Sequence, residues 1–227
     1  MKLNKIALAV GAAVMGLSSI AAAEFSANVG VTSNYVFRGV SLSGDDAAVS
    51  GGLDYAHDSG FYAGTWASSM GGAGEEVDLY AGFGGSAGDL SYDVNVFYYW
   101  YPSASSSNYT ELGASLSYGP VTGGLAYTIQ SQVSDTAANE MFIEGDIYYY
   151  LSASTEVAPT WSLGGTIGYY DFDNDGVSGI GTSYAHYQLD VTKSAGDFGD
   201  FTFSASVADE ESGDNDPIIF VSWNKSF

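Results

Sequence analysis

Apolar and polar side chains alternate with a period of two along most of this 227-residue chain. In the segment 24–38, one face carries the apolar side chains of Phe25, Ala27, Val29, Val31, Tyr35 and Phe37. The opposite face carries polar or small residues: Ser26, Asn28, Gly30, Thr32, Asn34 and Arg38. Successive side chains of a strand point to opposite faces, so this pattern predicts a single strand of about 14 residues.

The same alternation recurs in later segments of the chain. They are 47–56, 60–69, 76–85, 89–101, 108–118, 120–130, 140–152, 160–170, 183–193, 200–208 and 217–227. Together with the first segment they predict an all-β protein of about 12 strands. Most of the aromatic residues near the strand ends, Tyr35 and Phe37 among them, are expected to lie at two membrane interfaces.

The links between these segments alternate in length. Short links at 57–60, 86–89 and 118–120 contrast with longer polar links at 39–46, 101–108, 130–140, 170–183 and 208–217. This layout is typical of a transmembrane antiparallel β-barrel with short periplasmic turns and longer extracellular loops. Its apolar face meets lipid and its polar face lines a lumen, because only a closed sheet pairs all strand backbone groups in a bilayer.

Both ends of the chain agree with export to a bacterial outer membrane. Residues 1–23 have a basic start, an apolar run and small residues up to Ala23, so they predict a cleaved signal peptide before a single barrel domain, 24–227. The final strand carries Trp223 and Phe227 at even steps on its apolar face. This ending resembles the signal that the barrel-assembly machinery reads, although Lys225 interrupts the apolar face.

Charge and composition exclude several classes of protein. The chain has 27 acidic and five basic residues, and removal of Lys2 and Lys5 with the leader takes the formal charge from −22 to −24. Nucleic acid is therefore excluded as a partner. The absence of cysteine from the sequence excludes disulfides and thiolate metal sites. The expected partners are outer-membrane lipid and small solutes.

Two stretches resemble a known family. They are "TSNYVFRGVS" at 32–41 and "GGLDYAHDSGFYAGTWASSM" at 51–70. In these stretches the chain is similar to small proteobacterial proteins of the TorF-type porin family, most closely over residues 24–101. The resemblance implies an outer-membrane barrel and, by the family name, a porin.

The polar face predicts a pore. Its candidate lining residues are Arg38, Asp54, Asp78, Asp93, Glu111, Glu144, Asp146, His186 and Asp190. Carboxylates on a pore wall concentrate cations and repel anions, so we expect passive diffusion of small solutes with a preference for cations. Arg38 is expected either to pair with a wall carboxylate, Asp54 or Asp78, or to stand opposite the acidic wall at a constriction.

An alternative is a non-conducting barrel whose acidic loops bind divalent cations or a surface ligand. Bulky residues on the predicted lumen face favour it: Phe97, Tyr99, Phe142, Tyr148 and Tyr150. In one long loop, Asp171, Asp173 and Asp175 precede Gly176 with the spacing of the first half of a calcium loop. The closing glutamate is missing, since Thr182 occupies that place, so any Ca²⁺ site would be weak. No other cofactor is expected.

Enzyme chemistry has little support in the sequence. A hydrolytic triad needs a nucleophile, a base and an orienting group in defined roles. Of the two histidines, His57 falls in a predicted turn and His186 in the middle of a predicted strand, without a glycine-flanked serine beside either. We therefore predict no catalytic residues and no enzyme.

Overall fold

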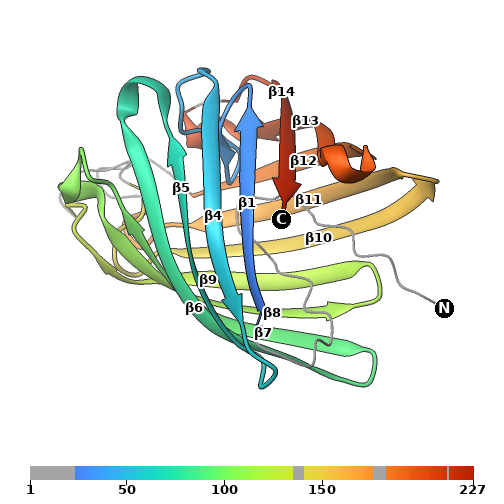
Figure 1. Cartoon of the computed structure of the whole chain (residues 1–227). Coiled ribbons are helices and arrows are strands. Elements are labelled where there is room, and N and C mark those ends of the chain that lie inside the picture. Colours follow the sequence, from blue (N-terminus) through green and yellow to red (C-terminus); the bar gives the residue numbers. More distant parts are fainter. Residues whose placement is uncertain (1–23, 135–140, 176–182, 214) are drawn as a thin grey trace.

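The computed structural model describes residues 24–134, 141–175, 183–213 and 215–227. In this part of the chain, twelve strands close into one antiparallel barrel, in which each strand pairs with its neighbours and the first pairs with the last (Figure 1). The wall strands are β1 (Glu24–Thr32), β4 (Ala48–Ala56), β5 (Phe61–Ser69), β6 (Glu75–Ala87), β7 (Leu90–Trp100), β8 (Tyr109–Tyr118), β9 (Val121–Ser131), β10 (Ile147–Ala158), β11 (Trp161–Asp171), β12 (Tyr184–Ser194), β13 (Asp200–Ala208) and β14 (Ile218–Ser226). The predicted fold class is confirmed.

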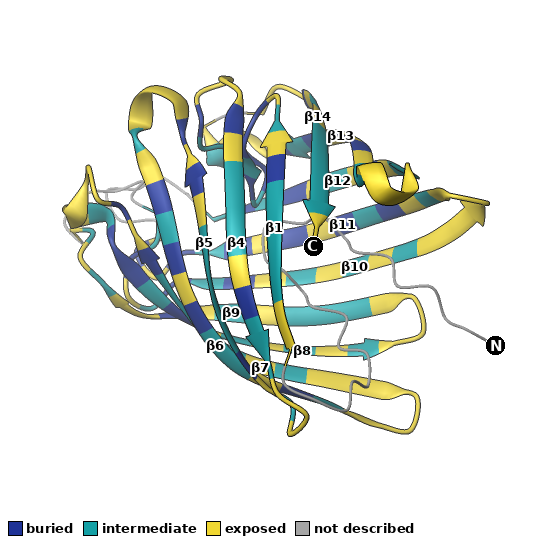
Figure 2. Cartoon of the chain, viewed as in Figure 1, coloured by how far each residue is buried: buried dark blue, intermediate teal, exposed yellow. Residues whose placement is uncertain are grey.

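The outer face of the wall is apolar and the inner face is largely polar. On β4, Leu53 is 62% exposed whereas its neighbour Asp54 is 6% exposed, and the same contrast separates Leu189 from Asp190 on β12. Figure 2 shows exposed and buried residues alternating along the strands. The period of two in the sequence therefore reports the two sides of one closed sheet.

The two ends of the barrel differ. At one end, called here the turn end, successive strands are joined by short turns such as 57–60, 88–89 and 119–120. At the other, the loop end, the connections are longer, and three of those described include short 3₁₀ helices: η1 (Gly71–Ala73), η2 (Ser105–Ser107) and η5 (Glu210–Ser212). None of the described helices is long and apolar enough to cross a bilayer.

The connection between β1 and β4 folds into the barrel instead of away from it. Its short strands β2 (Val36–Phe37) and β3 (Val40–Ser41) form a separate two-stranded sheet, called here the inner hairpin. Arg38 and Gly39 form its two-residue turn with φ values of 48° and 91°. Such a turn requires positive φ at both positions, and glycine adopts it without strain.

The inner hairpin overturns part of the sequence interpretation. The predicted strand 24–38 ends at Thr32, and Tyr35 and Phe37 are buried inside the barrel, 9% and 5% exposed, instead of facing lipid. The hairpin strands also alternate with a period of two, which is why the pattern continued without a visible break. A second predicted strand, 140–152, begins only at Ile147.

Candidate functional site

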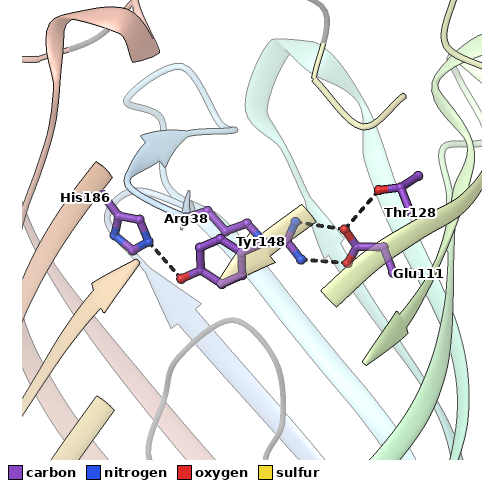
Figure 3. Close-up of polar contacts among 5 residues, drawn as sticks. All are labelled: Arg38, Glu111, Thr128, Tyr148 and His186. Atoms are coloured by element: carbon purple, nitrogen blue, oxygen red, sulfur yellow. Dashed lines mark hydrogen bonds and ion pairs between the residues drawn. The ribbon is translucent and has the colours of Figure 1, made fainter. Parts of the chain in front are cut away.

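The tip of the inner hairpin holds the only ion pair in the described part of the chain. The two guanidinium nitrogens of Arg38 donate to the two carboxylate oxygens of Glu111 on β8, at 2.8 and 2.6 Å. Figure 3 shows Arg38 reaching from the hairpin to Glu111, with Tyr148 and His186 at its other side. The side chains of Arg38 and Glu111 are only 7% and 3% exposed, so this ion pair is desolvated as well as bidentate.

Aromatic rings surround the guanidinium. Its central carbon lies 4.7 Å from the ring centroid of Phe37, 4.3 Å from that of Tyr148 and 4.9 Å from that of Tyr170. The hydroxyl of Tyr184 donates to the backbone carbonyl of Arg38 at 3.0 Å. Burial alone would lower the pKa of Arg38, but Glu111 raises it well above its usual value, so the group stays charged.

The inner hairpin joins two buried aromatic clusters. Phe37 belongs to one, with Tyr99, Tyr101 and Tyr109, and Val40 belongs to the other, with Tyr148 and Tyr170; Leu42 and Phe142 pack against both. Phe142 enters from the connection between β9 and β10, with φ 67°. The loop end of the lumen is therefore filled by side chains of two inward connections.

Stacked rings continue this filling along the wall. Tyr80 stacks on Phe97 at 4.9 Å between centroids, Tyr99 stacks on Tyr109 at 4.3 Å, and Tyr109 stacks on Phe142 at 4.5 Å. Offset stacking at such distances stabilises a pair by about 0.5–1.5 kcal/mol beyond area burial. The bulky residues expected on the lumen face thus pack against one another as a continuous ladder.

Glu76 on β6 is a buried carboxylate that the sequence interpretation missed. It is 1% exposed and accepts the hydroxyl of Tyr35 on one oxygen and that of Tyr101 on the other, both at 2.6 Å. Burial and the Glu76 charge raise the pKa of Tyr35 well above its usual value, so Tyr35 remains a donor. Glu76 lies two residues before Asp78 on the same face of β6, so the period of two that predicted Asp78 as a lining residue also predicts Glu76.

Carboxylates deeper in the lumen are also held by neutral donors. Asp54 accepts the hydroxyl of Tyr80, and Asp93 accepts the hydroxyl of Tyr62 at 2.9 Å. Asp190 accepts the hydroxyl of Ser204 at 2.6 Å. Hydroxyl donors fix the carboxylates in place and add no positive charge beside them.

The lumen wall is therefore strongly acidic. At least six carboxylates point inward: Asp54, Glu76, Asp78, Asp93, Glu111 and Asp190. Arg38 is the one described lysine or arginine that opposes them, because Lys193 and Lys225 lie on the outer face. Asp78 also has a buried oxygen that lacks a protein hydrogen-bond partner in the described structure.

Several predicted lining residues lie elsewhere than expected. Arg38 pairs with Glu111, not with Asp54 or Asp78, because the hairpin carries it across the lumen to β8. Glu144 and Asp146 precede β10 and lie in its entry turn, where Glu144 is exposed and Asp146 is buried. The Asp146 carboxylate accepts the backbone N–H groups of Ile143 and Asp173, each at 3.1 Å. Burial raises the pKa of Asp146 to about 6, against the lowering effect of these donors.

His186 faces the lumen as predicted. Its Nε2 lies 2.8 Å from the hydroxyl of Tyr148, and the two rings stack. His57 lies in an exposed turn, with its Nδ1 2.9 Å from Ser59 Oγ. These contacts combine neither histidine with a carboxylate, so they do not define a triad.

The first half of the predicted calcium loop does not converge on one point. Asp175 accepts the backbone N–H of Ser183, and Asp173 uses its own N–H to bind Asp146. Asp171 ends β11. Within the described residues no group of three or more acidic, histidine or cysteine side chains is arranged to hold a metal. Residues 176–182 lie outside the described part, so the Ca²⁺ site stays a prediction.

Trp223 and Phe227 lie on the outer face of the final strand as expected. The indole Nε1 of Trp223 donates to the backbone carbonyl of Phe198 at 2.6 Å, and Phe227 is 70% exposed. The role of this ending as an assembly signal stays a prediction. Residues 1–23, the predicted signal peptide, lie outside the described part.

Comparison with known proteins gives one family and a set of barrels. The family model described as "Bacterial protein of unknown function (Gcw_chp)" matches residues 18–222. No curated protein matches the chain. Among solved structures, the KdgM porin is similar with a TM-score of 0.58 at 6% identity, covering 87% of this chain and 98% of that one. The NanC porin is similar with a TM-score of 0.51 at 8% identity, covering 89% and 98%. At such low identity these likenesses establish the barrel fold alone.

Proposed function

Because this chain belongs to the Gcw_chp family of bacterial proteins and folds as a closed twelve-stranded barrel, we propose that it is a porin-like channel of the bacterial outer membrane. It passes small solutes passively and prefers cations. The apolar outer face meets lipid, the short turns face the periplasm and the long loops face outward. The similar barrels named as porins support this proposal, as does the resemblance to TorF-type porins.

The acidic lumen is the observation that carries the cation preference. At least six inward carboxylates stand against one guanidinium, and neutral hydroxyls hold several of them in place. Uncompensated carboxylates in a narrow, low-dielectric passage attract cations and exclude anions. The single Arg38 is paired with Glu111, so it does not compensate the other wall carboxylates.

The inner hairpin limits what the channel admits. It fills the loop end of the lumen together with Phe142, so a solute must pass between its edge and the wall, or the hairpin must move. Twelve strands already enclose a lumen narrower than that of 16-stranded porins. We therefore infer that the channel has a lower single-channel conductance than the wide pore of a general porin.

The same filling favours a second candidate, a plugged barrel that does not conduct at rest. In that case the acidic loops, including Asp209, Glu210 and Glu211 between β13 and β14, would bind divalent cations or a surface ligand. The weak Ca²⁺ site of Asp171, Asp173 and Asp175 belongs to this candidate.

Planar-bilayer recording separates the two candidates. Purified, folded protein in a KCl gradient should give discrete steps whose reversal potential moves toward that of potassium. Folding is verified beforehand by the different gel migration of boiled and unboiled samples in detergent. A folded protein that stays silent, both unmodified and as the Arg38→Ala variant, would exclude the channel and leave the plugged barrel.

A further inference from the structure

The two described lysines lie together on the outside of the barrel. Lys193 is the tenth residue of β12 and Lys225 is near the end of β14, both at the turn end. They share the outer face with the exposed residues Leu189 and Ile219, as the alternation along each strand requires. In a chain with 27 acidic residues, the cationic charge of the outer wall is thus confined to one sector.

One aromatic ring lies beside each ammonium group. The Nζ of Lys193 lies 5.0 Å from the ring centroid of Trp161, and that of Lys225 lies 4.9 Å from that of Phe227. Strand pairing places Trp161, Lys193, Phe201 and Trp223 side by side on four consecutive strands, β11 to β14. Trp and Tyr collect at the level of lipid headgroups, so this row marks where the bilayer surface meets the barrel.

The turn that joins β12 and β13 completes this sector. Its 3₁₀ helix η4 (Gly196–Phe198) folds against β14, where the carbonyl of Phe198 accepts the indole N–H of Trp223. Gly199 approaches so closely that an added Cβ would lie 2.2 Å from the backbone oxygen of Asn224. The Phe198 ring is 78% exposed, which suits a side chain immersed in the interface.

Neither lysine forms an ion pair with another residue in the described part of the chain. Arg38 and Glu111 form the single ion pair of the described residues, and Lys193 Nζ donates instead to the hydroxyl of Thr160. Asp197 is exposed in the turn, and Asp200 points to the lumen side of β13, opposite to Phe201. Two unpaired ammonium groups at headgroup depth, flanked by aromatic rings, match the chemistry of a lipid phosphate.

We propose that Lys193, Lys225 and the aromatic row of β11–β14 form a binding site for an anionic phospholipid of the periplasmic leaflet. The phosphate accepts hydrogen bonds from the two ammonium groups, and the acyl chains lie on the apolar wall above Trp161 and Trp223. This inference rests on the proposed membrane location but not on conduction. Strand spacing and the rise per residue place the Cα atoms of the two lysines about 12 Å apart. Their long side chains can therefore both reach one lipid headgroup.

Fluorescence quenching by brominated lipid tests this site. In a Trp66→Phe, Trp100→Phe background, Trp161 and Trp223 remain as the reporters, and both lie in the proposed site. The protein is reconstituted in vesicles of phosphatidylcholine with increasing brominated phosphatidylglycerol or, in parallel, brominated phosphatidylcholine. We expect phosphatidylglycerol to bind more tightly, by roughly fivefold for each engaged lysine, and the preference to fall at high salt.

The control variants assign that preference to the two side chains. Lys193→Gln with Lys225→Gln should bring the relative affinity for phosphatidylglycerol to about that of phosphatidylcholine, whereas Lys193→Arg with Lys225→Arg should keep it. If the double glutamine variant does not fold, each single variant should lose about half of the preference on a logarithmic scale. Equal quenching by both lipids in the parent protein, or an unchanged preference in folded glutamine variants, would disprove the site.

The outcome is separable from that of the proposed function. A protein that inserts and conducts but binds both lipids equally loses only the lipid site. A protein that does not insert into vesicles at all overturns the membrane location, and the lipid site with it.

Discussion

Removing the Arg38 guanidinium should destabilise the barrel strongly, although the residue lies in a connection and not in a wall strand. Arg38→Ala leaves the Glu111 carboxylate, 3% exposed, buried without its cation, and it removes two charge-assisted hydrogen bonds of 2.8 and 2.6 Å. Breaking a buried ion pair by deleting one partner costs about 3–5 kcal/mol. Loss of the contacts with three aromatic rings adds to this, so we expect the upper part of that range.

A double-mutant cycle distinguishes the ion pair from general packing. Arg38→Ala and Glu111→Ala should each lower the free energy of unfolding, and the double variant should lose less than their sum by about 2 kcal/mol or more. Arg38→Met with Glu111→Leu, which replaces both charges by apolar groups, should recover much of the loss. Arg38→Lys keeps the charge without the fork and should fall between the parent and Arg38→Ala.

Urea unfolding in lipid vesicles, followed by tryptophan fluorescence, measures these differences, and heat-dependent gel migration gives an independent ranking. For a chain of this length, 1 kcal/mol corresponds to about 2–4 °C in Tm, so Arg38→Ala should melt on the order of 10 °C lower. Asp197→Ala, in an exposed turn, is the control and should change stability by less than about 0.5 kcal/mol. An Arg38→Ala variant within 1 kcal/mol of the parent would show that the hairpin is not held by this pair.

Three further outcomes follow from the structure. Gly39→Ala should lower the free energy of unfolding by about 2–4 kcal/mol in the same assay, because φ is +91° and the new Cβ would lie 2.5 Å from the Cβ of His186. A variant as stable as the parent would show that Gly39 does not pack tightly against His186. Asp190→Asn should lower the cation-to-anion permeability ratio by up to about sevenfold, because one charge ~7 Å from the path in water stabilises a cation by ~0.6 kcal/mol and destabilises an anion by the same amount. An unchanged reversal potential would place Asp190 off the path. Asp146 has a pKa raised to about 6, so its ionisation disfavours the folded state as pH rises from about 4 to 7. Solvent near the rim of the barrel screens part of this electrostatic penalty. The free energy of unfolding of the parent should therefore fall by about 2 kcal/mol relative to that of Asp146→Asn over this pH range. Parallel pH profiles of the two proteins would contradict the raised pKa of Asp146.

The sequence predicted the wall of the barrel well because the outer and inner faces of a closed sheet impose opposite demands on neighbouring residues. If Leu53 and Asp54, or Leu189 and Asp190, exchanged places, a carboxylate would move to the apolar outer face, so the alternation records directly which side each residue faces. The lengths of the links were equally informative, since short and long connections segregate to opposite ends.

The interior was harder to predict because side chains that pack inside the lumen obey the same alternation. Tyr35 and Phe37 look like lipid-facing residues in sequence, yet they face an apolar filling made of Tyr99 and Tyr109. The local signal was Arg38-Gly39, a pair suited to a two-residue turn with positive φ. The partner of Arg38 could not be read locally, because Glu111 is 73 residues away and its position depends on the register of every strand between them.

The position of the inner hairpin has a consequence for how the barrel is assembled. Its tip binds Glu111, 73 residues later, and Tyr184, 146 residues later, so these contacts form only after most of the wall exists. The seam that closes the wall, β1 with β14, has five paired positions against nine between β1 and β4. A slip of one residue between strands would turn Glu111 to the outer face of the barrel and leave Arg38 without its carboxylate. The contacts of the hairpin tip with Glu111 and Tyr184 therefore stabilise only the barrel whose strands pair in the correct register.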